Sequence, residues 1–122
     1  MLLNENVINE LNKYNLFEDV NKIIKEDNII KVYEEDINFI VSTNIKAYFN
    51  DVCNNNADFL IKIVSNEKVN KCLLHIEESG FSIDLVEQSI NRIRTTFGED
   101  VDVIFSRKES NDKDIKILFI AC

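Results

Sequence analysis

The chain has 122 residues, of which 45% are hydrophobic, and its 22 acidic and 14 basic residues give a formal net charge of -8. This size suits one hydrophobic core, so we expect a single domain over residues 1–122. A surface this acidic repels phosphate backbones and anionic membrane faces, which argues against nucleic acids and membranes as partners.

Targeting signals and cysteine pairs are both absent from the sequence. No apolar run comes near the ~20 residues that cross a bilayer, and residues 1–9 carry no basic cluster of a signal peptide. Cys53, Cys72 and Cys122 lie far apart, without the paired spacing of disulfide or zinc frameworks. We therefore expect a cytoplasmic protein without a metal site or a cofactor.

The first 27 residues have the period of a helix. Apolar residues recur at steps of three and four, and the pattern breaks near Asn15. The members of this stripe are Val7, Leu11, Tyr14, Phe17, Val20 and Ile24. Acidic residues at 34–36 favour the start of a second, brief helix that runs to about Ser42. We interpret residues 1–27 as an N-terminal helical segment and residues 28–122 as an α/β body.

The rest of the chain alternates between strand and helix periods. Two-residue alternation predicts strands over residues 44–51, 72–77, 101–105 and 115–121. Helical spacing predicts helices over residues 57–66 and over residues 83–97, the latter between an N-cap at Ser82 and Gly98. The polar link at 109–114 favours a hairpin of the last two strands. The predicted fold is α+β, a four-stranded mixed sheet with helices packed on one face.

One core should lie between this sheet and its helices. The residues expected in it are Leu74, Ile76, Ile90, Ile93, Val103, Phe105, Ile117 and Phe119. On the long helix the expected apolar stripe also includes Ile83, Val86 and Phe97.

Residues 72–122 carry a family resemblance. They contain the strands CLLHIEES, VDVIFS and IKILFIAC and the pair Ile93–Arg94 in the helix between the first two strands. These segments resemble the end of the C-terminal domain of FtsZ, the bacterial tubulin homologue, where the strands typically read VLVNITGG, ANIIFG and VTVIATG. Upstream, residues 30–41 resemble the family stretch INVDFADVRTVM, and residues 4–27 occupy the place of the long helix between the two tubulin-like domains.

The resemblance implies an interaction role without GTP hydrolysis. The family's phosphate loop lies in a domain that these 122 residues do not contain, and Gly80 and Gly98 cannot replace it. The family's NxDxxD loop, which contacts the neighbouring subunit's nucleotide, maps onto Lys31, Tyr33 and Asp36, so one acid survives. We take these three as interface candidates, assign no catalytic residue, and expect a non-enzymatic cell-division protein that binds or caps FtsZ-like filaments or associates with itself.

Two other interpretations of the whole chain remain open, a degenerate fragment with no present role and an enzyme or ligand-binding protein. The predicted order of elements also suits a small oligomeric enzyme or ligand-binding protein of the chorismate-mutase type, although clustered basic residues for an anionic substrate are scarce. Cys53 would be a nucleophile only if His75 lay close to it in space. His75 itself is predicted on the strand face opposite Cys72, partly buried or at an edge.

Overall fold

The computed structural model describes residues 2–26, 28–54, 68–80 and 82–122. Along the chain the elements are α1 (Glu5–Asn12), α2 (Phe17–Lys25), α3 (Glu34–Ile40), β1 (Ala47–Cys53), β2 (Lys71–Glu78), α5 (Ile83–Phe97), β3 (Asp102–Glu109) and β4 (Ile115–Ala121). The helix expected at 57–66 falls outside the described residues. None of the described helices is long and apolar enough to cross a membrane.

The four strands form one mixed sheet in the order β1-β4-β2-β3. β4 runs antiparallel to both β1 and β2, and β2 runs parallel to β3. The α+β class with a mixed four-stranded sheet behind an N-terminal helical segment is therefore confirmed.

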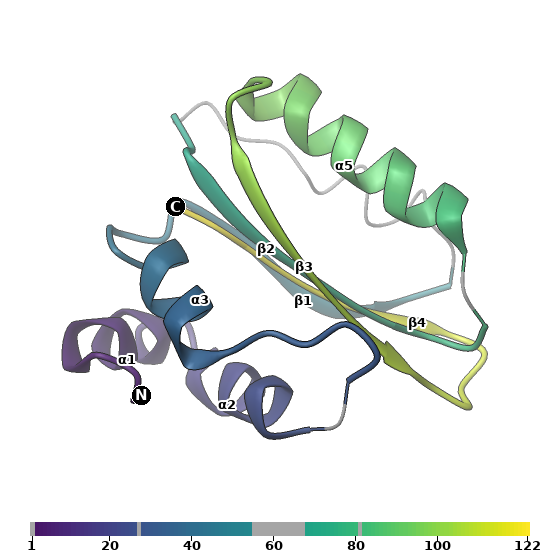
Figure 1. Ribbon diagram of the computed structural model, residues 1–122, viewed down its shortest axis with the longest axis horizontal. Coiled ribbons are helices and arrows are strands. Elements are labelled where there is room, and N and C mark those ends of the chain that lie inside the picture. Colours follow the sequence, from purple (N-terminus) through teal and green to yellow (C-terminus); the bar gives the residue numbers. More distant parts are fainter. Residues whose placement is uncertain (1, 27, 55–67, 81) are drawn as a thin grey trace.

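Helices cover both faces of this sheet (Figure 1). The sequence had predicted helices on one face only. We call the side covered by α1, α2 and α3 the N-terminal face and the side covered by α5 the α5 face. The cause lies in the central strands, because residues 72–76 of β2 and 117–121 of β4 are all buried. Such continuous buried runs need cover on both sides.

The expected hairpin of the last two strands is wrong, because β2 lies between β3 and β4. The two central positions go to the most apolar strands, whereas β3 has exposed ends at Asp102 and Glu109 and is half-buried over much of its length. That composition suits an edge strand.

The N-terminal helical segment breaks near Asn15, as the sequence indicates. Asn15 has a φ of 57°, the left-handed conformation that asparagine tolerates, and it separates α1 from α2. Their buried stripes pack with those of α3 against residues of β2 and β4. The buried members of this cluster include Val7, Leu11, Val20, Ile23, Ile37, Ile40, Leu73, Leu118 and Ile120.

On the α5 face the helix begins at the predicted residue, but it buries a different side from the one predicted. Ser82 Oγ accepts a hydrogen bond from the Leu85 N–H at 3.3 Å, which confirms Ser82 as the N-cap. The buried stripe is Leu85, Ser89 and Ile93, spaced by one helical turn, whereas Ile90 is half-buried and Ile83 is 57% exposed. The stripe expected through Ile83 and Ile90 is thus rotated toward Leu85, while Val86 and Phe97 of the expected stripe pack at its border.

Candidate interface

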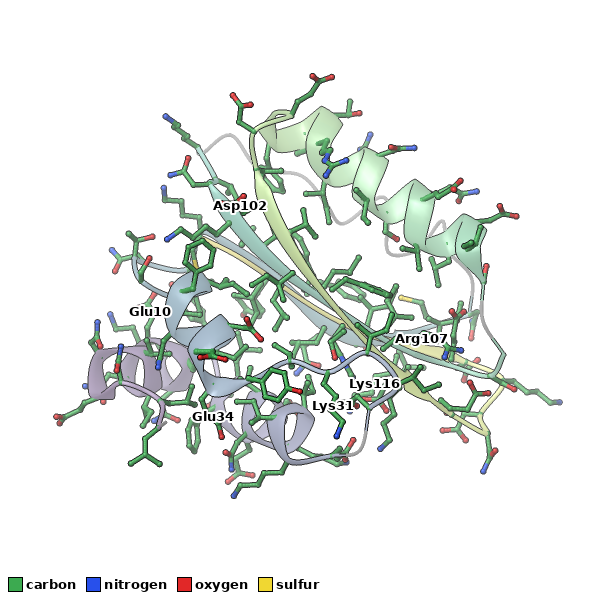
Figure 2. All side chains as sticks on the ribbon, viewed as in Figure 1. Glu10, Lys31, Glu34, Asp102, Arg107 and Lys116 are labelled. Carbon is green, nitrogen blue, oxygen red and sulfur yellow. The ribbon has the colours of Figure 1, made fainter. Side chains whose placement is uncertain are left out.

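Two of the three interface candidates point outward from the connection between α2 and α3. Lys31 is exposed, Tyr33 is 53% exposed, and Val32 between them is buried at 1%. This alternation fixes the connection in an extended course with one side against the core. Figure 2 shows Lys31 on this connection and Glu34 farther along, at the start of α3.

Asp36 belongs to the helix start that the acidic residues at 34–36 predict. Its Oδ2 accepts a hydrogen bond from the Tyr33 N–H at 2.8 Å. Tyr33 is the N-cap residue of α3, so the carboxylate satisfies an N–H left over at the helix start. The single acid that the resemblance preserves is therefore occupied by the helix that carries it.

Exposed apolar side chains directly precede these candidates in the sequence. Ile29 is 61% exposed and Ile30 is 38% exposed, and they are followed directly by Lys31 and Tyr33. We call residues 29–36 the interface segment. Large exposed side chains that follow one another in this way are typical of a surface that another protein covers.

The start of the interface segment is tied to the edge of the sheet. The N–H groups of Ile29 and Ile30 both donate to the carbonyl oxygen of Arg107, at 2.9 and 3.2 Å, and the Arg107 N–H donates back to Ile30 at 3.1 Å. This antiparallel bridge covers part of the outer edge of β3. Figure 2 shows Arg107 where the connection meets this strand.

Directly behind the bridge lies a buried polar network. His75 and Ser106 are both fully buried, and His75 Nδ1 lies 2.9 Å from Ser106 Oγ. His75 Nε2 lies 3.1 Å from Glu77 Oε2, and the Ser106 hydroxyl donates to the Ile30 carbonyl oxygen at 3.1 Å. Burial lowers the pKa of His75 from its ordinary value of 6.5, although the Glu77 carboxylate opposes this shift.

This serine, histidine and glutamate have the residue types of a hydrolytic triad but not its access. The Ser106 hydroxyl is buried under Ile30 and is engaged with its carbonyl oxygen. The cavity beside His75 and Glu77 measures about 10 Å³, room for one water molecule at most. No substrate could reach Ser106 in this arrangement.

The histidine lies on the predicted face but is more deeply buried than expected. In the strand register His75 is opposite Leu118 and Ser106, on the N-terminal face, while Cys53 belongs to the cluster on the α5 face. The two side chains lie on opposite sides of the sheet, so a Cys53–His75 nucleophile is wrong. Burial also raises the pKa of Cys72 and of Cys122 to about 12, which keeps both thiols protonated.

Sequence reasoning missed Glu10, which is buried on α1. Glu10 Oε2 accepts a hydrogen bond from the Ile45 N–H at 2.7 Å, and its Oε1 pairs with Lys13 Nζ at 2.9 Å. Burial raises the pKa of this carboxyl. The Ile45 hydrogen bond and Lys13 together lower the pKa by more, so the net shift is downward from 4.5. The signal was present, since Glu10 lies within the apolar stripe of its helix between Val7 and Leu11. Ser106, at the end of an apolar strand run, gave a weaker signal of the same kind.

Comparison with known proteins identifies the fold. No protein-family description and no curated protein matches the sequence. Among solved structures, the empty FtsZ dimer of M. jannaschii matches with a TM-score of 0.62 at 10% identity, over 98% of this chain and 40% of that one. The W319Y mutant of the same FtsZ matches with a TM-score of 0.61 at 9% identity, over 98% and 41%. GDP-form protofilaments of TubZ from Bacillus thuringiensis serovar israelensis match with a TM-score of 0.63 at 7% identity, over 88% and 34%.

At these identities the likeness concerns the fold alone. The chain spans about 40% of the FtsZ chains that it matches, which agrees with the resemblance to one domain of that protein, the C-terminal one. The resemblance inferred from the sequence is confirmed at this level: the chain has the fold of the corresponding part of the tubulin-like proteins FtsZ and TubZ.

Proposed function

We propose that this chain is a non-catalytic interaction module that binds the end of a tubulin-like filament in the cytoplasm, with the interface segment as its contact surface. The observation that carries the proposal is the exposure of Lys31 and Tyr33, which the resemblance maps onto the loop by which the FtsZ family contacts the neighbouring subunit. The matched FtsZ structure is a dimer and the matched TubZ structure a set of protofilaments. A role in cell division follows if the filament is FtsZ.

The charges of the segment suit nucleotide contact without hydrolysis. Where the resemblance places an asparagine and an aspartate, this chain has Lys31 and Tyr33, so one negative charge is lost and one positive charge is gained. A cation there attracts the triphosphate of a neighbouring subunit. The acid that could orient the attacking water, Asp36, caps its own helix instead. The docked chain would hold the nucleotide and leave it intact.

Capping follows from the head-to-tail growth of such filaments. Each subunit needs two unlike surfaces, one that covers a nucleotide and one that carries it. The only glycines of these 122 residues are Gly80 and Gly98, which lie in a turn and at a helix end. They form no cluster of amides that could cradle phosphates. A docked copy therefore offers no nucleotide surface for the next subunit.

Light scattering of FtsZ from the same organism, titrated with the 122-residue protein, tests this proposal. With GTP present, polymer mass should fall at substoichiometric ratios of the protein to FtsZ. Lys31→Glu and Tyr33→Ala should abolish the effect, because they remove the cation and the largest exposed side chain of the segment. Matched controls are Lys113→Glu, in the exposed β3–β4 turn, and Ile83→Ala, 57% exposed at the start of α5.

Two results would overturn the proposal. One is unchanged polymer mass and GTP turnover at equimolar protein, and the other is loss of activity in the controls as well as in the segment variants. Calorimetry with GTP and magnesium should show no saturable heat for the protein alone, and micromolar binding would show that a nucleotide site exists in it. Sedimentation of the free protein checks self-association, which would compete for the same surface.

A further inference from the structure

A chain of hydrogen bonds joins a buried histidine to the main chain of the interface segment. His75 Nδ1 contacts Ser106 Oγ at 2.9 Å, and Ser106 Oγ contacts the Ile30 carbonyl oxygen at 3.1 Å. On the other side of the ring, Nε2 contacts Glu77 Oε2 at 3.1 Å. His75 and Ser106 have no solvent exposure, so each must find its partners inside this network.

The number of protons in the network depends on the charge of His75. Ser106 has one hydroxyl proton and two neighbouring acceptors when His75 is neutral, because the Glu77 carboxylate keeps the ring proton on Nε2 and leaves Nδ1 bare. The hydroxyl proton is then shared between Nδ1 and the Ile30 carbonyl. When His75 is an imidazolium, Nδ1 donates to Ser106 Oγ, and the hydroxyl proton is free for Ile30 alone.

We propose that His75 and Ser106 act as a hydrogen-bond relay, in which protonation of the histidine tightens the attachment of the interface segment to β3. The proton comes from solvent and stays on the imidazole, and only the partner of the Ser106 hydroxyl changes. The main-chain bridge between Ile30 and Arg107 remains in both states, so the relay adjusts this attachment and does not create it.

Charged groups from the surrounding elements face the ring and set the pH at which the relay works. They are Glu77 on β2, Asp19 and Lys22 on α2, Glu26 directly after α2, and Lys116 on β4, with Lys108 of β3 paired to Glu26 at 2.6 Å. Burial lowers the pKa of the imidazole, the carboxylates of Glu77 and Glu26 oppose that shift, and Lys116 adds to it. The relay should therefore respond below about pH 6.5.

Local attachment and global stability respond to acid in opposite directions. The small cavity beside His75 is lined by Ile23 of α2 and Leu118 of β4, and Nε2 keeps its contact with Glu77, so Ile30 can detach from Ser106 without removing these neighbours of the imidazole. Detachment of the segment then costs the extra hydrogen bond but does not solvate the charge. Global unfolding does solvate it, so the same proton weakens the whole fold.

Hydrogen exchange of the free 122-residue protein tests the relay. The amides of Ile29 and Ile30 should gain about threefold to tenfold protection, corrected for intrinsic exchange rates, as His75 titrates. Ser106→Ala should abolish the gain. Ser89→Ala is the matched control, since Ser89 is equally buried on the α5 face and its hydroxyl has no hydrogen-bond partner within the described part of the chain.

A second measurement on the unmodified protein covers the case in which Ser106→Ala does not fold. Nitrogen chemical shifts of the neutral His75 ring should place its proton on Nε2. A neutral ring protonated on Nδ1, a protection unchanged through the titration, or a gain that persists in Ser106→Ala would each overturn the relay. A pH-dependent affinity for filaments rests on the proposed function, but hydrogen exchange does not, so the two can fail separately.

Discussion

The two faces of the sheet differ in what they bury. Beneath the middle of α5, the side chains facing the sheet are apolar apart from Ser89, and they pack on Leu74, Ile117 and Phe119. On the N-terminal face, the same depth holds the charged Glu10 and the network of His75 and Ser106 among the apolar residues. The α5 face also buries Glu78 and Arg107, but they lie beside the start of α5, where Glu78 Oε1 accepts a hydrogen bond from the Ser82 N–H. The middle of the α5 face is therefore held by packing, and the N-terminal face by packing combined with polar groups that require specific partners.

This contrast matters because the polar face carries the candidate interface. Apolar packing tolerates changes of shape as long as volume is kept, whereas a buried polar group that loses its partner is costly. The interface segment is attached to β3 on the side where such groups are found. Variants on the two faces should therefore differ in their response to pH more than in their cost at neutral pH.

The largest expected effect is the same on both faces. Ile93→Ala on α5 and Leu11→Ala on α1 each remove a fully buried side chain and should lower the free energy of unfolding by about 2–5 kcal/mol. Ile90→Ala, at a half-buried position, should cost less, about 1–2 kcal/mol. Urea unfolding at neutral pH measures all three. A cost for Ile90→Ala equal to that for Ile93→Ala would show that the observed orientation of α5 is wrong.

Glu10 should make the N-terminal face sensitive to strong acid. Because the pKa of Glu10 is lowered in the folded state, its contribution is present above about pH 4.5 and is lost as the pH falls. Glu10→Gln should cost about 1–2 kcal/mol at neutral pH and flatten the acid limb of the stability curve. Glu5→Gln, exposed on the same helix, is the control. An acid limb that survives in Glu10→Gln would assign it to other carboxyl groups.

His75 should add a second, milder pH dependence. A lowered pKa in the folded state means that the unfolded chain binds the proton first, so the free energy of unfolding falls as the pH drops below about 6.5. His75→Gln should remove this slope whatever its cost at neutral pH. Chemical denaturation at a series of pH values measures it. The same slope in both proteins would exclude His75 as its source.

The smallest expected effect concerns Asp36. Removal of its bond to the Tyr33 N–H by Asp36→Ala should cost about 0.5–1 kcal/mol, the usual effect of a lost cap. Glu35→Ala, exposed on the same turn, should be nearly neutral. Thermal unfolding of the pair measures the difference. Equal stability of the two variants would contradict the capping role and leave Asp36 available for an interface role.

Local signals in the sequence were sufficient for the helix start at Ser82 and the break at Asn15 but not for the order of the strands. Ser82 and Asn15 act through neighbours within three residues or through their own backbone, so the helix start and the break at these positions were predictable. The partner of β3 was not predictable, because α5 separates β2 from β3 in the sequence and Val103 pairs with Cys72 beyond it. Alternation does not indicate which strand lies beside another.

The placement of the interface candidates was predictable in the same partial way. Exposure of Lys31 and Tyr33 follows from the resemblance together with the burial of Val32 between them. The attachment of Ile30 to Ser106 and Arg107 joins residues more than seventy positions apart, and no local pattern predicts it. The sequence could not decide between two roles for Asp36, because the same carboxylate suits a helix start and a catalytic loop.

The place of β4 in the sheet constrains how this chain can be made. β4 is the last strand in sequence, yet it pairs with both β1 and β2 and so occupies the centre of the sheet. A nascent chain leaves the ribosome from its N-terminus, so until residues 115–121 emerge, β1 has no partner in this sheet and one edge of β2 is unpaired. The apolar residues of β1 and β2 stay exposed during that interval. Folding must therefore wait for the final strand, and a translational pause shortly before it would prolong the state most prone to aggregation.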